Sequence, residues 1–351
     1  MFQHFLRHKG QRFGSAGKRQ PGKSGLFPWV ESTYFCSFCR AGSYQLHMWQ
    51  ALLQSLTGGN TSALARSISL VENEYAGYLN FLESLPPGKG GKIIGVTGPP
   101  GAGKSTLVNG LITELVGQHY KVGVLCVDPS SPFNLGAVLG DRIRMSSWYL
   151  HPQVFIRSLA TRGSIGGLHP KIIEITELLK AAAFDYIVVE TVGVGQSEIE
   201  IAGLADTTVV VLVPEGGDEV QTMKAGLMEI ADIFVVNKSD RPGADALVRA
   251  LQLMLSGAFR NRKEEVPIIK TVAQEGTGLK QLVANIQLLQ DNMQVNDKRT
   301  WLLVEKAWQM IQQRRMTDIS RVKLKTAIEK ESGDGFHLFR FINSFLKSGS
   351  C

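Results

Sequence analysis

The sequence predicts an α/β fold in which a mostly parallel β-sheet is flanked by helices on both faces. The first observation behind this prediction is that short β-branched runs alternate with segments of helical periodicity from Lys92 to Gln290. The second is that a polar residue directly follows several of these runs, as at Asp128, Glu190 and Asn237. Because ligands bind beyond the carboxyl ends of parallel strands, this order also predicts where a site lies.

Valine and isoleucine dominate the runs that we interpret as strands. These are Lys92–Thr97, Val122–Val127, Val154–Arg157, Tyr186–Val189, Thr207–Val213, Ile233–Val236 and Val266–Lys270. The segments between them place apolar residues three or four positions apart, which is typical of helices packed on a sheet. They are Thr106–Val116, Lys171–Ala182, Glu219–Met228, Asp245–Ser256 and Gly278–Gln290.

Helices are also predicted on both sides of this α/β region. The first follows Met48, and the second runs from Ser62 to Leu82, before the stop at Pro86. In the tail, two tryptophans, Trp301 and Trp308, share one helical stripe, which favours a dimerisation arm over a helix packed on its own domain. The predicted divisions are 1–47 (a disordered basic extension), 48–88 (N-terminal helices), 89–292 (the α/β domain) and 293–351 (a C-terminal helical arm).

The net charge of +7 is concentrated at the N-terminus. Residues 1–47 contain seven lysines and arginines and one acidic residue, so the rest of the chain is close to neutral and a nucleic-acid partner is not expected. Such a basic segment resembles a mitochondrial transit peptide; the alternative is an upstream extension, with Met48 as the start. No apolar run is long enough to span a bilayer, so no membrane partner is expected either. We therefore expect a cytoplasmic protein, or a mitochondrial-matrix protein if residues 1–47 are a transit peptide.

A glycine-rich segment between the first predicted strand and helix fits G-x-x-x-x-G-K-[ST], the phosphate-binding P-loop. Its residues are Gly98, Pro99, Pro100, Gly101, Ala102, Gly103, Lys104, Ser105 and Thr106. The glycines let consecutive backbone amides point at phosphate oxygens, and the following helix adds the positive end of its dipole. Lys104 is expected to reach the β- and γ-phosphates, and the Ser105 hydroxyl to hold Mg²⁺.

Carboxylates after two further strands complete a predicted nucleotide site. Glu190 is expected to hold Mg²⁺ directly or through water, and Asp128 to point at the same metal ion. Gly193 follows Glu190 closely enough for its amide to bind the γ-phosphate and release it after hydrolysis. The predicted catalytic residues are therefore Lys104, Glu190 and Gly193, with Asp141 added by the resemblance described below.

The segment Asn237-Lys238-Ser239-Asp240 fits N-K-x-D, which reads guanine. The Asp240 carboxylate is expected to accept hydrogen bonds from two donors of guanine that adenine does not present together, which favours GTP over ATP. A last base-contacting loop is predicted at Val272, Ala273 and Gln274. The expected ligands are thus GTP or GDP with Mg²⁺.

Together these motifs resemble the MeaB / methylmalonic aciduria type A protein family across roughly residues 50–315. The segments that carry the resemblance are G-P-P-G-A-G-K-S, V-D-P-S-S, L-G-D-R-I-R-M, A-T-R-G, E-T-V-G-V-G-Q-S-E, G-G-D-E and N-K-S-D. The resemblance implies a homodimeric P-loop GTPase that acts as a chaperone for an adenosylcobalamin-dependent acyl-CoA mutase, gating cofactor loading. One departure is Asn134-Leu135, where members of the family usually have glycines.

The resemblance also implies roles for individual residues. Ser105, Asp128, Asp141 and Glu190 would form the magnesium shell, with Asp141 in switch I. Residues 193–198 would form switch II, and a third switch would contain Asp218, Glu219 and Lys224. Two alternatives stay open: a nickel-type metallochaperone GTPase, which requires a His/Cys cluster near the switches, and a small-molecule kinase, which requires an acceptor pocket.

Overall fold

A computed structural model describes residues 35–87, 90–128, 145–161, 168–191, 197–215, 226–258, 266–291, 297–315, 319–331 and 336–348. The chain divides into two units, residues 1–48 and residues 49–351, and the second contains the sheet. Helix α1 (Phe35–Thr57) begins within the basic segment 1–47, which was predicted to be mostly disordered. No proline lies between Pro28 and Pro86 to interrupt the backbone hydrogen bonding of this helix.

Among the described residues, seven parallel strands form one sheet in the order β3-β2-β4-β1-β5-β6-β7. The strands are β1 (Lys92–Thr97), β2 (Val122–Asp128), β3 (Val154–Ala160), β4 (Tyr186–Glu190), β5 (Thr207–Leu212), β6 (Ile233–Val236) and β7 (Ile268–Lys270). All seven predicted strands are present, and the predicted α/β fold is confirmed. Strand β1 lies at the centre, so the loop that follows it has neighbouring strands on both sides.

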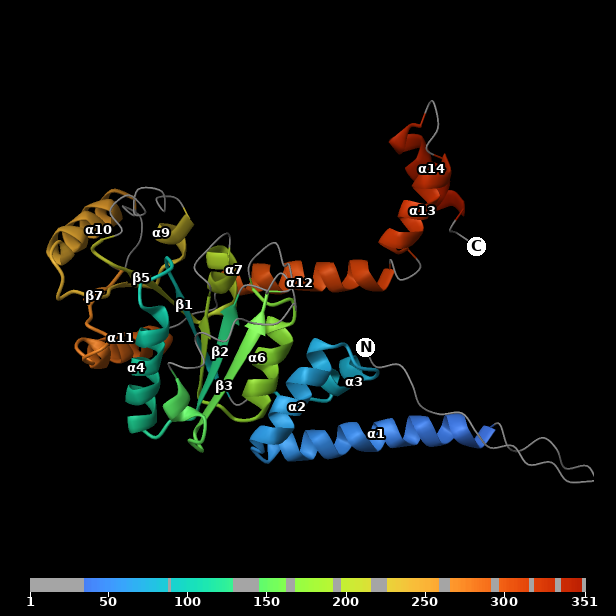
Figure 1. Ribbon diagram of the computed structural model, residues 1–351, viewed down its shortest axis with the longest axis horizontal. Coiled ribbons are helices and arrows are strands. Elements are labelled where there is room, and N and C mark those ends of the chain that lie inside the picture. The colour runs from blue at the N-terminus through green and yellow to red at the C-terminus, as the bar shows by residue number, and fades with distance from the viewer. Residues whose placement is uncertain are drawn as a thin grey trace, which may run out of the picture. The chain divides into compact units, whose positions relative to one another are not determined.

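Helices cover both faces of the sheet (Figure 1). Helices α4 (Lys104–Gly117) and α11 (Leu279–Asp291) lie on one face, whereas α6 (Ile172–Ala181), α7 (Ser197–Leu204) and α10 (Ala244–Ala258) lie on the other. The remaining elements are α2 (Thr61–Glu72), α3 (Tyr78–Glu83), η1 (Ser146–Trp148), α9 (Gly226–Ile230), α12 (Asp297–Arg315), α13 (Arg321–Glu331) and α14 (Leu338–Ser348). Helix α7 was not predicted from the sequence.

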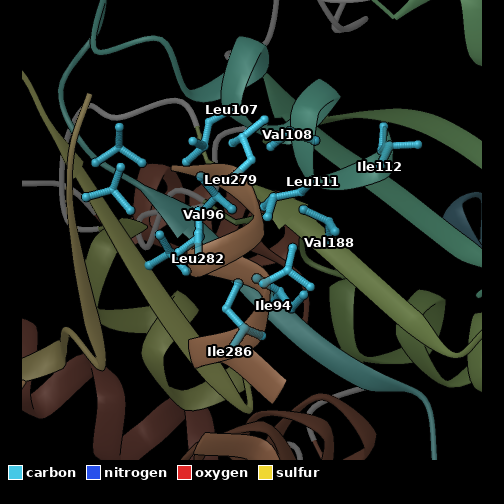
Figure 2. Close-up of a cluster of buried hydrophobic side chains, with 14 of the residues drawn as sticks. Ile94, Val96, Leu107, Val108, Leu111, Ile112, Val188, Leu279, Leu282 and Ile286 are labelled. Carbon is cyan, nitrogen blue, oxygen red and sulfur yellow. The ribbon is translucent and has the colours of Figure 1, made fainter. Parts of the chain in front are cut away.

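The core beneath the P-loop joins β1 to α4 and α11. Figure 2 shows Ile94 and Val96 of β1 packed with Leu107 and Leu111 of α4 and Leu282 of α11, all of them fully buried. Burying each side chain of this size contributes about 1.5–3 kcal/mol. The strand and the helix that bracket the P-loop are therefore held firmly together.

The single helix predicted from Ser62 to Leu82 is wrong, because the structure divides this segment into α2 and α3. Between them Glu74 and Gly77 have φ values of 50° and 86°, which a right-handed helix does not allow. The indole of Trp49 donates a hydrogen bond of 3.0 Å to the carbonyl of Ala76 in the same break. This contact comes from a residue distant in sequence, so local periodicity could not reveal it.

Helix α12 has one face on the α/β domain and another in solvent. It packs against α7, and the Lys306 ammonium ion donates to the Pro170 carbonyl at 2.5 Å and lies 3.4 Å from a Glu174 carboxylate oxygen. The side chains of Trp301 and Trp308 are 73% and 58% exposed. Of the helices within the described ranges, none combines the length and the apolar character needed to cross a bilayer.

Candidate nucleotide-binding site

Several predicted site residues gather at the carboxyl edge of the sheet. Asp128 and Glu190 are the last residues of β2 and β4, which are neighbours, and Asn237 directly follows β6. All three are almost fully buried, at 6%, 4% and 2% exposed. Burying polar groups is costly unless they are hydrogen-bonded or bind a ligand, so each of these side chains requires a polar partner at this edge.

The P-loop turns sharply between β1 and α4. Gly98 and Gly101 have φ values of 143° and 77°, in the region that favours glycine. Gly103 is the N-cap of α4 and has no side chain that could bond the amides of the first turn. The N-terminal end of α4 and the positive end of its dipole therefore face this loop, an arrangement that favours an anion.

Lys104 crosses the loop that it ends. Its ammonium ion donates to the carbonyls of Gly98 and Pro99 at 2.9 and 3.0 Å, and the residue is only 7% exposed. The charge is thus held over the loop by backbone oxygens. From this position the same group can exchange carbonyl oxygens for phosphate oxygens of a bound nucleotide.

Ser105 and Glu190 meet across the gap between α4 and β4. The Ser105 hydroxyl donates to Glu190 Oε1 at 2.7 Å, although 85 residues separate them in the chain. With Asp128 at the end of the adjacent strand, the set offers a hydroxyl and two carboxylates, which are the hard oxygen ligands that Mg²⁺ prefers. The donor chemistry of these residues fits the predicted magnesium ion.

The side chain of Asn237 joins the predicted guanine reader to the P-loop. Its amide nitrogen donates to the Ala102 carbonyl at 2.9 Å. Its amide oxygen accepts from the Thr271 hydroxyl and from the Ala273 backbone amide, both at 3.1 Å. One buried residue therefore fixes three segments of the site relative to one another.

Two further N-K-x-D residues lie toward solvent. Lys238 adopts a φ of 55°, and its ammonium ion donates to the Gly101 carbonyl at 2.9 Å. The Asp240 carboxylate is exposed, so a base can reach it. In the last predicted loop the Val272 amide donates to the Thr277 carbonyl at 3.1 Å, and Gln274 is exposed.

The structure thus brings together the P-loop, Asp128, Glu190, the N-K-x-D segment and the loop at 272–274. The predicted residues Asp141, Gly193, Asp218, Glu219 and Lys224 lie outside the described residues. Sequence reasoning missed the role of Thr271, which directly follows β7 as Asn237 follows β6. Its place at a strand end was the available signal.

A phosphate loop tied to a guanine-reading segment at the edge of a parallel sheet defines the class of P-loop GTPases. The family model described as "Methylmalonyl Co-A mutase-associated GTPase MeaB" matches residues 64–326, and the chain belongs to this family. The family resemblance predicted from the motifs is confirmed, as is the prediction of a GTPase.

Individual relatives agree with this assignment. The chain is 48% identical over 257 residues to a Pyrococcus horikoshii protein named as a GTPase, covering 71% of this chain and 81% of the relative. It is 39% identical over 193 residues to GTPase ArgK of Escherichia coli, covering 54% of this chain and 58% of ArgK. It is 38% identical over 207 residues to the mitochondrial methylmalonic aciduria type A homolog of Caenorhabditis elegans, covering 54% and 52%.

Among solved structures, a LAO/AO transport system kinase has a TM-score of 0.62 at 24% identity, covering 86% of this chain and 98% of that chain. At this identity the likeness shows the fold alone. It agrees with the parallel sheet and flanking helices described above.

Proposed function

We propose that this GTPase binds GTP with Mg²⁺ at the carboxyl edge of the sheet and uses the γ-phosphate to control a partner enzyme. The observation that carries the proposal is the Asn237 side chain, which bonds the P-loop at Ala102 and the last loop at Ala273. The segments proposed to bind the base and the phosphates are thereby held together by one side chain. Selection of guanine is assigned to Asp240, with Val272 and Gln274 beside the base.

Each residue near the phosphates has a separate task. The P-loop amides and Lys104 hold the phosphate oxygens, while Ser105, Asp128, Asp141 and Glu190 would hold Mg²⁺. The metal ion supplies charge neutralisation for the phosphates when bound. Positioning the phosphates accounts for most of the catalysis expected of such a site, and Gly193 is assigned to sensing the γ-phosphate.

We further propose that the partner is an adenosylcobalamin-dependent acyl-CoA mutase of the methylmalonyl-CoA type, and that the protein gates loading of its cofactor. The support is the description of the family, which names methylmalonyl-CoA mutase, together with the methylmalonic aciduria relative. Asp218, Glu219 and Lys224 are assigned to coupling the nucleotide state to that partner. Helix α9 follows this segment and packs against α7, whose first two residues belong to the segment assigned to switch II.

We also propose a homodimer formed through α12. At 100° per residue, Trp301, Val304, Trp308 and Ile311 share one face of the helix, and all four are about half exposed or more. Lys306, which bonds the α/β domain, points to the opposite side. The apolar face is thus turned away from its own domain, and a second copy is its proposed occupant.

The test uses purified protein and purified methylmalonyl-CoA mutase. Capture of the mutase is measured with a non-hydrolysable GTP analogue and with GDP, and we expect it to differ between the two. Equal capture in both states contradicts the switch.

Nucleotide binding is tested separately by calorimetry. Lys104→Ala is expected to abolish binding with the fold intact. Asp240→Asn is expected to weaken guanine selectivity more than tenfold, because the pair of hydrogen bonds to guanine is lost. Glu275→Gln, an exposed carboxylate in the neighbouring loop, is the control.

No observation favours the two alternatives. A nickel chaperone requires a cluster of ligands, and within the residues that the structure describes no three His, Cys, Asp or Glu side chains are grouped to hold a metal ion. The word kinase comes only from the name of a solved structure whose likeness shows the fold alone. If GTP carries a label on its γ-phosphate, we therefore expect the label to be released as inorganic phosphate rather than transferred to another acceptor molecule.

A further inference from the structure

Two buried threonines join the strand before the P-loop to the end of β4. Thr97 is the last residue of β1, and Thr191 directly follows Glu190. The Thr191 hydroxyl donates to Thr97 Oγ1 at 2.9 Å, and the Thr191 amide donates to the Val96 carbonyl at 3.0 Å. Backbone and side chain of Thr191 are therefore both attached to the root of the P-loop.

This threonine pair lies on the opposite face of the sheet from the Ser105–Glu190 bond. Val96 and Val188 belong to the core cluster under α4, as Figure 2 shows. Because side chains alternate along a strand, Glu190 points to that face, and Thr97 and Thr191 point to the other. The end of β4 is thus fastened to the P-loop segment twice, once on each face.

The hydrogen bond between Thr191 and Thr97 is buried and lies directly before the segment assigned to switch II. Thr97 and Thr191 are 0% and 1% exposed, so water does not compete for their hydrogen bond. The chain that follows Thr191 leads into the segment assigned to switch II. An attachment placed immediately before a switch keeps the preceding residue still while the switch changes conformation.

We propose that Thr191 is a positioning residue for the nucleotide-bound magnesium ion. Its hydroxyl, through Thr97, holds the root of switch II so that the Glu190 carboxylate stays beside Ser105 in every nucleotide state. This inference rests on the proposed binding of GTP with Mg²⁺. Removing a group that hydrogen-bonds a metal ligand typically changes metal affinity by about 10- to 100-fold, and because Thr191 acts on Glu190 through the backbone we expect the lower end of that range.

The test compares three substitutions in the full chain. Thr191→Val keeps the shape and removes the hydroxyl, and Thr191→Ser restores the hydroxyl. Thr208→Val is the matched control, because Thr208 is a 1% exposed threonine on β5 whose hydroxyl has no hydrogen-bond partner within the described part of the chain. The measurement is the Mg²⁺ concentration that half-saturates binding of a non-hydrolysable GTP analogue, by calorimetry, and that half-saturates GTP hydrolysis.

We expect Thr191→Val to raise both concentrations about tenfold, and Thr191→Ser to return them to within about twofold of wild type. The proposal is overturned if Thr191→Val matches Thr208→Val, or if Thr191→Ser is as impaired as Thr191→Val.

A double-mutant cycle with Thr97→Val gives a second readout, which separates the coupling of the two threonines from a general loss of stability. If the two valine substitutions add independently, the pair does not act as a unit. Wild-type protein that binds no GTP contradicts the proposed function instead.

Discussion

The side-chain amide of Asn237 donates to the carbonyl of Ala102 at 2.9 Å, across 135 residues of sequence. This hydrogen bond connects the segment that reads the base with the loop that reads the phosphates. Because Asn237 is 2% exposed and also accepts from Thr271 and Ala273, its truncation leaves several buried polar groups without their bonds.

Replacing Asn237 with alanine is therefore expected to damage both stability and binding. An unsatisfied buried polar group costs about 1–3 kcal/mol, so the free energy of unfolding should fall by at least that amount. GTP affinity should fall at least tenfold, since about 1.4 kcal/mol corresponds to a factor of ten. Denaturant unfolding and calorimetry measure the two effects. Ser239→Ala in the same segment is the control, and equal behaviour of the two variants contradicts the bridging role.

Two glycines of the P-loop predict a graded response to alanine. A Cβ on Gly98 would lie 2.1 Å from the Val211 carbonyl oxygen, so the backbone of β5 blocks it. A Cβ on Gly101 has no described heavy atom within 4 Å, so Gly101→Ala meets only the left-handed backbone penalty of about 1–2 kcal/mol. We expect Gly98→Ala to lose GTP binding and to unfold at a clearly lower temperature than Gly101→Ala. Equal melting temperatures of the two variants contradict this steric explanation.

The exposed tryptophans of α12 predict the consequence of disrupting the proposed dimer. Tryptophan is enriched among the few interface residues whose truncation costs about 2 kcal/mol or more. Trp301→Ala with Trp308→Ala should therefore convert a dimer into monomers at micromolar concentration, measured by sedimentation equilibrium. Leu150→Ala removes a side chain that is 97% exposed and far from α12 in sequence, and it should leave the assembly intact. A wild-type protein that sediments as a monomer refutes the proposed arm.

The Glu200 carboxyl on α7 predicts a dependence of stability on pH. Burial raises the pKa of Glu200, although a Leu168 backbone hydrogen bond and the charge of Lys306 act in the opposite direction. With its folded pKa above the unfolded value, this group contributes stability at low pH, and that contribution is lost as pH rises through the folded pKa.

Glu200→Gln should therefore be more stable than wild type at neutral pH, and the difference should shrink as pH falls toward about 4. Denaturant unfolding at several pH values measures it. Glu305→Gln, an exposed glutamate on α12, is the control. A difference that is constant with pH excludes titration of Glu200 as its cause.

The sequence by itself determined the elements whose signals are local. Strand β1, the glycine loop and α4 follow one another in the chain, and the N-K-S-D segment directly follows a β-branched run, so spacing and periodicity identified them. Local periodicity did not predict the break between α2 and α3. The break at Glu74 and Gly77 accompanies a hydrogen bond from distant Trp49 rather than any change of period.

Only the tertiary structure decided which of these local features meet. Ser105 reaches Glu190, Asn237 reaches Ala102, and Thr191 reaches Thr97, because β4, β1, β5 and β6 are consecutive in the sheet. Strand order is set by the packing of whole helices on both faces and by hydrogen bonds between distant segments, which no local pattern encodes. Short sequence motifs therefore identified the residue types of the site, whereas the order of the strands determined how those residues are arranged in space.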